Sequence, residues 1–440
     1  MAEFPDEIAI QPVAGPIRAR VHPPGSKSIT NRALVCAALA EGQSTLHGAL
    51  DSEDTHVMIE GLQALGIGVS VPNAGETDAG ETLVVSGCQG KPPAKRANLF
   101  VANSGTTLRF LTALATLGSG EFRLDGVARM RQRPLGDLAD ALGQLGAEVL
   151  CESPGSCPPV SIKSDGLRGG EASIRGDISS QFLSGLLMVA PYAREVVKLR
   201  VQGTLVSAPY VAMTAEVMRS FGVSPQCSAD YAQIVIPNDA GFHDAGYRGC
   251  EYAIEPDASA ASYFWAAAAI TGGEVAVVGL SRDSLQGDVA FVECLERMGC
   301  QVRYEADSVT VVGNSLRGID VDMNGISDTV QTLAVVALFA EGPTRVRNVA
   351  HIRHKETDRI AAVANELRKL GARVAEHDDG LEITPGQHTP AVIDTYQDHR
   401  MAMSFAIAGL KLPGIVIRDP GCTAKTYPRF FDDLDQARGS

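Results

Sequence analysis

"SITNRALVCAALAEGQSTLHG" (residues 28–48) contains the pattern on which the fold depends. A polar start is followed by an Ala-rich apolar stretch, a Gly-containing turn and a segment of alternating character. The apolar stretch has the length of a helix and is apolar nearly all round, so we expect that helix to be buried. The alternating segment predicts a strand. The stretch therefore predicts an interior helix that leads into a strand.

The same pattern recurs five more times at a spacing of about 70 to 79 residues. The further copies span residues 104–126, 179–201, 257–279, 328–349 and 399–419. A recurring period of this kind indicates a fold built from one repeated supersecondary unit.

A second kind of helix is predicted between these copies. Five segments have apolar residues at spacings of three and four, then a glycine, then an alternating stretch; they span residues 54–69, 134–149, 208–223, 288–302 and 359–374. This pattern is typical of an amphipathic surface helix that ends at glycine and leads into a strand. We find no clear sixth copy after residue 399. Each repeat is then roughly β-α-β-α-β-β in kind.

Six repeats in 440 residues suggest two lobes of three, because a single core does not usually grow to this length. The seam is expected near residues 243–257. Interior helices, surface helices and strands in regular alternation place the chain in the α/β class.

Composition limits the possible partners. The chain has 52 acidic and 38 basic residues and a net charge of −14, which argues against a nucleic-acid partner and against docking on anionic membranes. The nine cysteines form no metal-type pairs, which favours reduced thiols in a cytoplasmic compartment. The start, MAEFPDEIAI, is not expected to be a secretory signal, and no apolar run approaches the roughly 20 residues that span a bilayer.

The expected interior helices all begin with polar or charged residues. The six starts are Lys27-Ser28, Asn103-Ser104-Gly105, Ser179-Ser180-Gln181, Asp257, Asp328 and His399-Arg400. Helix starts present free N–H groups and a positive dipole end, which suit anions. A single such start is more often only a cap, but six in register predict a positive site within an acidic protein.

Basic side chains also cluster in short loops. "ARMRQRP" contains Arg129, Arg131 and Arg133, and we expect at least one of them to meet an anion. In "HIRHKETDR", Lys355 and Arg359 are four apart, which is unfavourable on a bare helix unless an anion lies between them. Phosphate-binding loops, dinucleotide fingerprints and zinc-protease spacings do not occur, so we expect neither a metal nor a cofactor. Acid–base chemistry on small anions is the reaction class that fits.

Five stretches together resemble the 5-enolpyruvylshikimate-3-phosphate synthase (3-phosphoshikimate 1-carboxyvinyltransferase) family. They are "PPGSKSITNRALVCAALAEG", "DISSQFLSGLLMVAP", "HIRHKETDRIAAVANELRKLGA", "DTYQDHRMAMSFAIAGL" and "DPGCTAKTYPRFF". The resemblance runs from about residue 10 to 435, with the motifs in the expected order. In "NSGTTLRFL", Thr107 and Phe110 replace an alanine and a proline of much of the family.

The resemblance implies a two-lobed inside-out α/β barrel with six βαβαββ-type units, three per lobe. The N-terminal strand would return to the C-terminal lobe through one of two crossovers. The lobes would comprise residues 26–252, and residues 1–25 plus 253–440. The implied reaction is transfer of the enolpyruvyl group of phosphoenolpyruvate to the 5-hydroxyl of shikimate 3-phosphate, the sixth step of the shikimate pathway toward chorismate and the aromatic amino acids. It implies a monomer without cofactor.

The resemblance also implies the site residues. Those for shikimate 3-phosphate are Lys27, Ser28, Arg32, Ser179, Ser180, Gln181, Ser207, Asp328, His351 and Lys355. Those for phosphoenolpyruvate are Lys27, Gly105, Arg129, Gln181, Arg359, Arg400 and Lys425. His351 stands where many members have an asparagine.

The implied chemistry is an addition followed by an elimination through a tetrahedral intermediate. Glu356 is the expected acid at the methylene carbon, and Asp328 the expected base at the 5-hydroxyl, assisted by Lys27. Groups with these tasks need pKa values moved toward neutrality.

Two other functions are alternatives to enolpyruvyl transfer onto shikimate 3-phosphate. UDP-N-acetylglucosamine enolpyruvyl transferase has the same fold and chemistry, but it requires a reactive cysteine in the loop that reads "GVARMRQRP" here. A non-catalytic anion-binding relative is the other alternative; the intact Lys27, Asp328, Glu356 and Lys425 oppose it.

Overall fold

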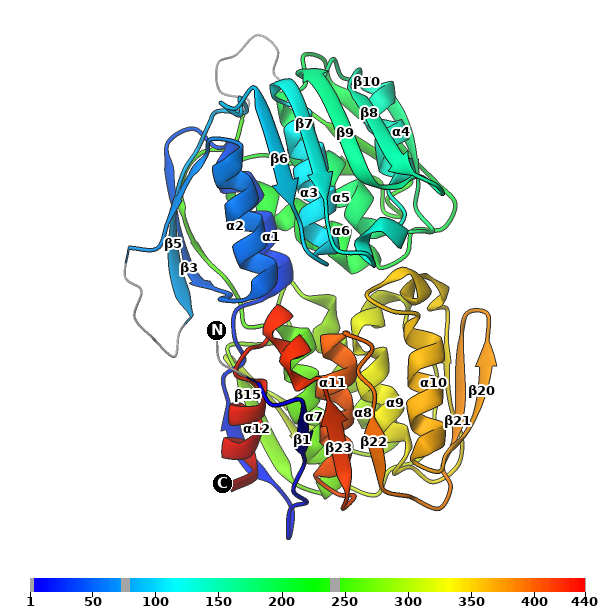
Figure 1. Ribbon diagram of the computed structural model, residues 1–440. Helices are drawn as coiled ribbons and strands as arrows, with labels where there is room; N and C mark the ends of the chain where they lie inside the picture. The colour runs from blue at the N-terminus through cyan, green and yellow to red at the C-terminus, as the bar shows by residue number, and fades with distance from the viewer. Residues whose placement is uncertain (1–3, 73–79, 238–245, 440) are drawn as a thin grey trace. The chain divides into compact units, whose positions relative to one another are not determined.

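The computed structural model describes residues 4–72, 80–237 and 246–439. The chain divides into two compact units (Figure 1), which we call the N-terminal unit, residues 25–254, and the C-terminal unit, residues 1–24 with 255–440. Whether each unit folds as an independent domain stays a prediction.

The described part of the N-terminal unit contains three four-stranded sheets. The first has the order β14 (Glu251–Ala253), β3 (Gln43–Ala49), β5 (Glu81–Ser86), β4 (Gly68–Ser70). The second has the order β6 (Arg96–Phe100), β7 (Ser119–Asp125), β9 (Cys157–Asp165), β8 (Glu148–Ser153). The third has the order β10 (Gly170–Arg175), β11 (Val197–Gln202), β13 (Gln233–Ile236), β12 (Gln226–Cys227). In each sheet the first pair is parallel and the other two pairs are antiparallel.

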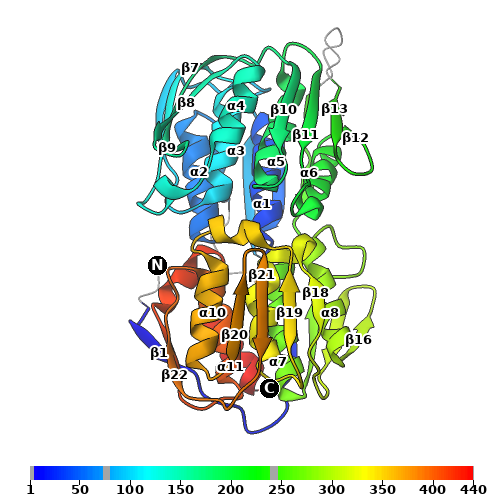
Figure 2. The same ribbon diagram turned by 90° about the vertical axis from the view of Figure 1, so that its right-hand side faces the viewer.

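The helices of this unit are of the two predicted kinds. The interior ones are α1 (Lys27–Leu39), α3 (Gly105–Ala115) and α5 (Ser180–Val189), and nearly every residue in them is buried. The amphipathic ones are α2 (Glu53–Ala64), α4 (Gly136–Gln144) and α6 (Ala208–Ser220), which expose part of their length. Figure 2 shows the sheets arranged around the interior helices. Helices inside and sheets outside are the arrangement that the family resemblance implied.

The C-terminal unit repeats this plan with one shorter sheet. Its four-stranded sheets have the orders β2 (Arg18–Val21), β15 (Glu274–Val278), β17 (Ser308–Val312), β16 (Gln301–Tyr304), and β18 (Asp320–Asp322), β19 (Thr344–Arg347), β21 (Gly380–Thr384), β20 (Arg373–His377). The third sheet has the order β22 (Ala391–Ile393), β23 (Ile415–Arg418), β1 (Glu7–Ala9). Its interior helices are α7 (Ala258–Thr271), α9 (Val330–Ala337) and α11 (His399–Gly409), and its amphipathic helices are α8 (Phe291–Met298) and α10 (Arg359–Lys369).

The sixth repeat corrects one sequence expectation. A second helix does follow β23, namely α12 (Phe430–Gly439), which packs against β2. It reaches a glycine, Gly439, but within the described residues no strand follows it as in the other five copies, so the sequence pattern did not reveal it. The sheet is completed instead by β1, which pairs antiparallel with β23.

The first strands of the two units are exchanged along the chain. In four repeats the strand before an interior helix pairs in parallel with the strand after that helix, as β6 does with β7 around α3. However, β2, which precedes α1, pairs with β15, and β14, which precedes α7, pairs with β3. This exchange returns the N-terminal segment to the C-terminal unit, as the resemblance implied.

Among the helices that the structure describes, none combines the length and the apolar character needed to cross a lipid bilayer.

Candidate active site

The start of α1 is held in place by its own backbone and by a buried ion pair. Ser26 caps the helix, because its Oγ accepts a hydrogen bond from the N–H of Ile29 at 3.4 Å. Gly25 packs so closely on β3 that a Cβ there would lie 1.9 Å from the Gly48 carbonyl oxygen. Lys27 is only 9% exposed, and its Nζ lies 3.6 Å from Oδ2 of Asp54. A nearly buried ammonium group thus opens the helix.

Arg32 lies one turn further along α1 and is 1% exposed. Its guanidinium donates to the Ser28 carbonyl and to Oγ1 of Thr214, both at 2.7 Å, and it also donates to Ser184 Oγ and the Tyr210 carbonyl, both at 3.3 Å. The Phe110 ring lies 5.3 Å from its Cζ. Burial lowers the pKa of Arg32 to about 10, so it stays charged at neutral pH. Arg32 joins α1 to α5 and α6, and its contact with a substrate stays a prediction.

The starts of α3 and α5 are brought together by one arginine. Arg109 donates from Nη1 to the Gly105 carbonyl at 2.9 Å and to Oε1 of Gln181 at 3.2 Å. Gln181 in turn donates to Oγ1 of Thr106 at 3.1 Å. Ser179 caps α5, accepting from the N–H of Gln181, and Ser180 is the first residue of that helix. Gly105 and Gln181, both predicted site residues, are therefore neighbours.

The three arginines of "ARMRQRP" have different surroundings. Arg131 is exposed and pairs with Asp125 at 2.7 Å, whereas Arg129 is half-buried and donates to Gln132 at 3.2 Å. Arg133 is buried and donates to the Asn103 carbonyl at 3.0 Å; its Nη2 would lie 2.3 Å from a Cβ at Gly105. Arg133 was not among the predicted site residues, although the arginine cluster that contains it was the signal.

Ser207 precedes α6 in a backbone conformation that non-glycine residues rarely adopt. Its φ of 52° and ψ of 44° are left-handed, and the residue is buried. Such strain persists only where the surroundings enforce it and is common at functional sites.

In the C-terminal unit, three cations converge on Asp328. Its Oδ2 lies 2.8 Å from Nη2 of Arg400, and its Oδ1 lies 3.1 Å from Nη1 of Arg359 and 3.5 Å from Nζ of Lys355. Asp328 sits in the 3-10 helix η4 (Asn324–Thr329), directly before α9. The anion that the sequence required between Lys355 and Arg359 is thus supplied by the protein itself.

Arg359 binds two further buried carboxylates. It lies 2.9 Å from Oε2 of Glu356 and 2.7 Å from Oδ2 of Asp398. Burial alone would lower the pKa of Arg359, but Asp398, Glu356 and Asp328 outweigh it, so the pKa is raised. Asp398 also caps α11, since it accepts from the N–H of Arg400 at 2.9 Å.

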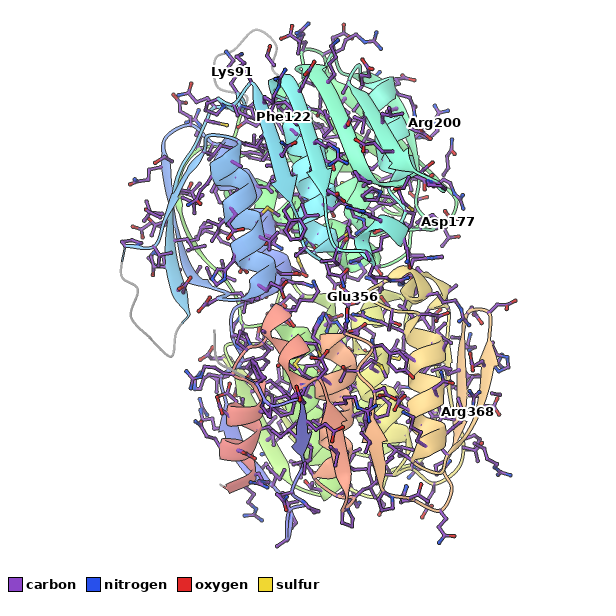
Figure 3. All side chains as sticks on the ribbon, viewed as in Figure 1. Lys91, Phe122, Asp177, Arg200, Glu356 and Arg368 are labelled. Carbon is purple, nitrogen blue, oxygen red and sulfur yellow. The ribbon has the colours of Figure 1, made fainter. Side chains whose placement is uncertain are left out.

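Glu356 and Lys425 complete the predicted residues of this cluster. Nζ of Lys425, at the end of the 3-10 helix η6 (Pro420–Lys425), lies 4.0 Å from Oε1 of Glu356. Figure 3 labels Glu356 at the end of the C-terminal unit where α10 begins. It also labels Arg368, near the other end of that helix. The structure therefore brings together five predicted residues of this unit: Asp328, Lys355, Glu356, Arg359 and Arg400, with Lys425 at their edge.

His351 lies in the 3-10 helix η5 (Ala350–His354) and is buried. Burial, then the positive charge of Lys355, lowers the pKa of His351 to about 4. The imidazole is therefore neutral at physiological pH and can donate or accept one hydrogen bond as a neutral group.

Sequence reasoning missed several charged residues of the site. Asp54 and Asp288 are buried acids, and nothing in their local pattern distinguishes them from acids in the first turn of an ordinary surface helix. Among the described residues, no group of three or more His, Cys, Asp or Glu side chains is arranged to hold a metal ion.

Comparisons with known proteins agree over almost the whole chain. The family model for EPSP synthase (3-phosphoshikimate 1-carboxyvinyltransferase) matches residues 12–434. The chain is 50% identical to the 3-phosphoshikimate 1-carboxyvinyltransferase of Nostoc punctiforme, covering 98% of this chain and 100% of that one. It is 46% identical to 3-phosphoshikimate 1-carboxyvinyltransferase 1, chloroplastic, of Nicotiana tabacum, covering 99% of this chain and 85% of that one.

A solved structure shows the same fold. The structure of EPSP synthase from Acinetobacter baumannii matches with a TM-score of 0.78 at 24% sequence identity, covering 98% of each chain. This agreement confirms the two-lobed α/β architecture. The chain therefore belongs to the EPSP synthase (3-phosphoshikimate 1-carboxyvinyltransferase) family of transferases.

Proposed function

We propose that this chain transfers the enolpyruvyl group of phosphoenolpyruvate to the 5-hydroxyl of shikimate 3-phosphate and releases phosphate. The observation that carries this proposal is the pair of carboxylates, buried Glu356 and partly buried Asp328, held on the single guanidinium of Arg359. The reaction needs one group to remove the hydroxyl proton and another to protonate the methylene carbon. Two carboxylates fixed on one arginine can divide these tasks.

The proposed addition step forms one carbon–oxygen bond and moves two protons. The 5-hydroxyl oxygen forms a bond to the central carbon of phosphoenolpyruvate while its proton passes to Asp328, assisted by Lys27. Glu356 gives its proton to the methylene carbon, which becomes a methyl group. The product of this step is a tetrahedral intermediate that still carries the phosphate.

Elimination reverses the proton movement at carbon. The methyl group returns a proton to the Glu356 carboxylate as the bond from the central carbon to the phosphate oxygen breaks. Phosphate leaves with the electron pair of that bond and takes up the proton that Asp328 received in the addition step. The vinyl group and the Asp328 carboxylate are thereby restored. Cations that face Glu356 and Asp328 stabilise the negative charge that develops on the leaving group.

We propose the substrate contacts that the family resemblance implies, and the chemistry of the side chains supports several of them. Arg400 and Arg359 are planar donors suited to carboxylate and phosphate, and Lys425 adds a point charge beside Glu356. The phosphoenolpyruvate residues are Lys27, Gly105, Arg129, Gln181, Arg359, Arg400 and Lys425. The shikimate 3-phosphate residues are Lys27, Ser28, Arg32, Ser179, Ser180, Gln181, Ser207, Asp328, His351 and Lys355.

We further propose that the chain works as a cytoplasmic monomer without a nucleic-acid partner. All nine cysteines are free thiols, which suits a reducing compartment. The net charge of −14 opposes binding to nucleic acid. Light scattering coupled to size-exclusion chromatography tests the oligomeric state: a mass near 46.3 kDa is expected, and a mass near twice that value contradicts the proposal.

Phosphate release from phosphoenolpyruvate, with and without shikimate 3-phosphate, tests the function. Release is expected only when both are present; release regardless of shikimate 3-phosphate would rule the function out. Asp328→Asn should reduce kcat by about a hundredfold or more, the usual range for a lost general base. Asp307→Asn, at an exposed carboxylate of the same unit, is the matched control and should leave kcat unchanged.

A further inference from the structure

Asp288 is a buried carboxylate that has no part in the function proposed above. It lies in the first turn of the 3-10 helix η3 (Gly287–Ala290), which leads into α8, and is 3% exposed. Its Oδ2 accepts a short hydrogen bond from the hydroxyl of Ser259, in the first turn of α7. A buried carboxylate is costly unless something in the structure compensates for it.

The neighbouring residue Gln286 fixes this segment to the start of α7. Its Oε1 accepts a hydrogen bond from the N–H of Ala258 at 3.0 Å, and its Nε2 donates to the Pro256 carbonyl at 2.6 Å. Asp288 therefore cannot shift without disturbing the first turn of that interior helix. Its position is set by the fold and not by a flexible loop.

The segment η3 also packs against η4, the element that carries Asp328. The groups that act on Asp288 are Asp257 and Ser259 from α7, Asp328 from η4 and Arg400 from α11. Arg400 is the residue that binds Asp328 at 2.8 Å. Because η3 and η4 pack together, Asp288 and the proposed base Asp328 lie on neighbouring elements, and their charges interact.

Charge balance explains why a carboxylate is tolerated here. Four buried or nearly buried cations surround the site in this unit: Lys355, Arg359, Arg400 and Lys425. They bind three carboxylates, Asp328, Glu356 and Asp398. Ionised Asp288 adds a negative charge to this group, as does Asp257 at the start of α7.

We propose that Asp288 is a positioning residue that acts through Asp328: its negative charge keeps the Asp328 carboxylate basic and so speeds removal of the proton from the substrate hydroxyl. This inference rests on the proposed function, in which Asp328 is the base. Two like charges in a buried site disfavour each other, and each therefore binds a proton more readily than it would alone. The effect requires Asp288 to be ionised.

The pH dependence distinguishes this role from a structural one. Burial, then the charge of Asp328, raises the pKa of Asp288 to about 6. Asp288 is therefore largely protonated at pH 5 and largely ionised at pH 8. Asp288→Asn keeps the shape and an acceptor for Ser259 but removes the charge at every pH.

The experiment compares kcat of the wild type and Asp288→Asn from pH 5 to 8, with both substrates saturating. The variant should be slower by about three- to tenfold at pH 8, and the ratio should approach one at pH 5. KM for both substrates should change by less than about twofold. A ratio that is the same at every pH, or a variant as fast as the wild type, would overturn the inference.

Two further variants complete the test. Asp283→Asn removes an exposed carboxylate shortly before η3 and should match the wild type at every pH. Ser259→Ala removes the hydrogen bond that lowers the pKa of Asp288, so its kcat should fall below that of the wild type between pH 6 and 7 and recover by pH 8. This variant keeps the inference testable if Asp288→Asn does not fold. A Ser259→Ala variant whose kcat equals that of the wild type between pH 6 and 7 would contradict the inference.

The two proposals can fail separately. A wild type that releases no phosphate in response to shikimate 3-phosphate contradicts the proposed function. A wild type that is active, with kcat ratios that do not depend on pH, contradicts only the role of Asp288.

Discussion

Arg359 binds Asp398 through two parallel hydrogen bonds, from Nε to Oδ2 at 2.7 Å and from Nη2 to Oδ1 at 3.2 Å. Both side chains are almost fully buried. Because Arg359 is the first residue of α10 and Asp398 caps α11, this pair fixes the starts of two helices of the C-terminal unit relative to each other. The remaining nitrogen of the same guanidinium binds Asp328.

Arg359→Lys should therefore destabilise the protein strongly. A lysine cannot form the two-pronged bond, and the carboxylates of Asp398, Glu356 and Asp328 would lose part of their compensation. We expect the free energy of unfolding to fall by about 3–5 kcal/mol, the cost of breaking a buried ion pair. Urea denaturation measures it. Arg368→Lys, on the exposed face of the same helix, is the control and should cost less than about 0.5 kcal/mol; a similar loss in both variants would contradict the assignment.

Lys27→Ala should weaken binding of shikimate 3-phosphate. A charge-assisted hydrogen bond to an anion contributes about 1.5–3 kcal/mol, so the Kd should rise by about 10- to 100-fold. Titration calorimetry measures this directly. Lys91→Ala removes an exposed lysine of the same unit and should leave the Kd unchanged. Equal affinities of the wild type and Lys27→Ala would mean that the ammonium group does not contact the substrate.

Gly105→Ala should impair the use of phosphoenolpyruvate. The new Cβ would lie 2.3 Å from nitrogens of both Arg109 and Arg133, so these side chains must move and Gln181 loses its support. KM for phosphoenolpyruvate should rise by about tenfold, equivalent to about 1.4 kcal/mol. Gly143→Ala, inside α4 with nothing within 4 Å of the new Cβ, is the control and should leave KM unchanged. An unaltered KM in Gly105→Ala would show that the arginines adjust without cost.

His351→Asn should make the protein less sensitive to acid. The pKa of His351 is lowered from 6.5 to about 4, chiefly by burial and then by Lys355. The folded state binds fewer protons there than the unfolded state, so this contribution to stability is complete above pH 6.5 and is lost as the pH falls through 4. The wild type should lose about 1–3 kcal/mol more than the variant over this range.

Denaturation at several pH values between 4 and 7 tests the prediction for His351. His56→Asn makes the same change at an exposed site and should follow the wild type. If wild type and His351→Asn lose stability in parallel, the histidine is not buried in its neutral form.

Much of the fold could be predicted because each repeat has a recognisable pattern in its local sequence. Residues 28–48 predicted a helix and a strand, and the structure has α1 at Lys27–Leu39 and β3 at Gln43–Ala49. The helix α12 escaped prediction because no alternating strand pattern follows it, unlike the other amphipathic helices. The strand exchange could not be read from periodicity either, since β2 and β14 look the same whichever sheet they join; the family resemblance supplied that expectation.

The prediction of the site residues missed some of the acidic ones. Arginines and lysines in short loops stand out in an acidic sequence, so Arg359, Arg400 and Lys425 were readily proposed. Asp54 and Asp288 sit within patterns typical of a surface helix, and only the packing of the interior helices reveals that they are buried. The internal hydrogen bonds of Arg32 could not be predicted from local sequence either, because three of its four acceptors lie on Ser184, Tyr210 and Thr214, up to 182 positions away.

The exchange of β2 and β14 has a consequence for synthesis on the ribosome. Residues 25–254 contain every strand that their three sheets use, so that half has all its partners once Ala253 has emerged. Strands β1 and β2 have their partners elsewhere: β2 pairs with β15, and β1 pairs with β23, and both partners are made after the N-terminal unit. Strands β1 and β2 are thus made before the N-terminal unit but can pair only after that unit has been made.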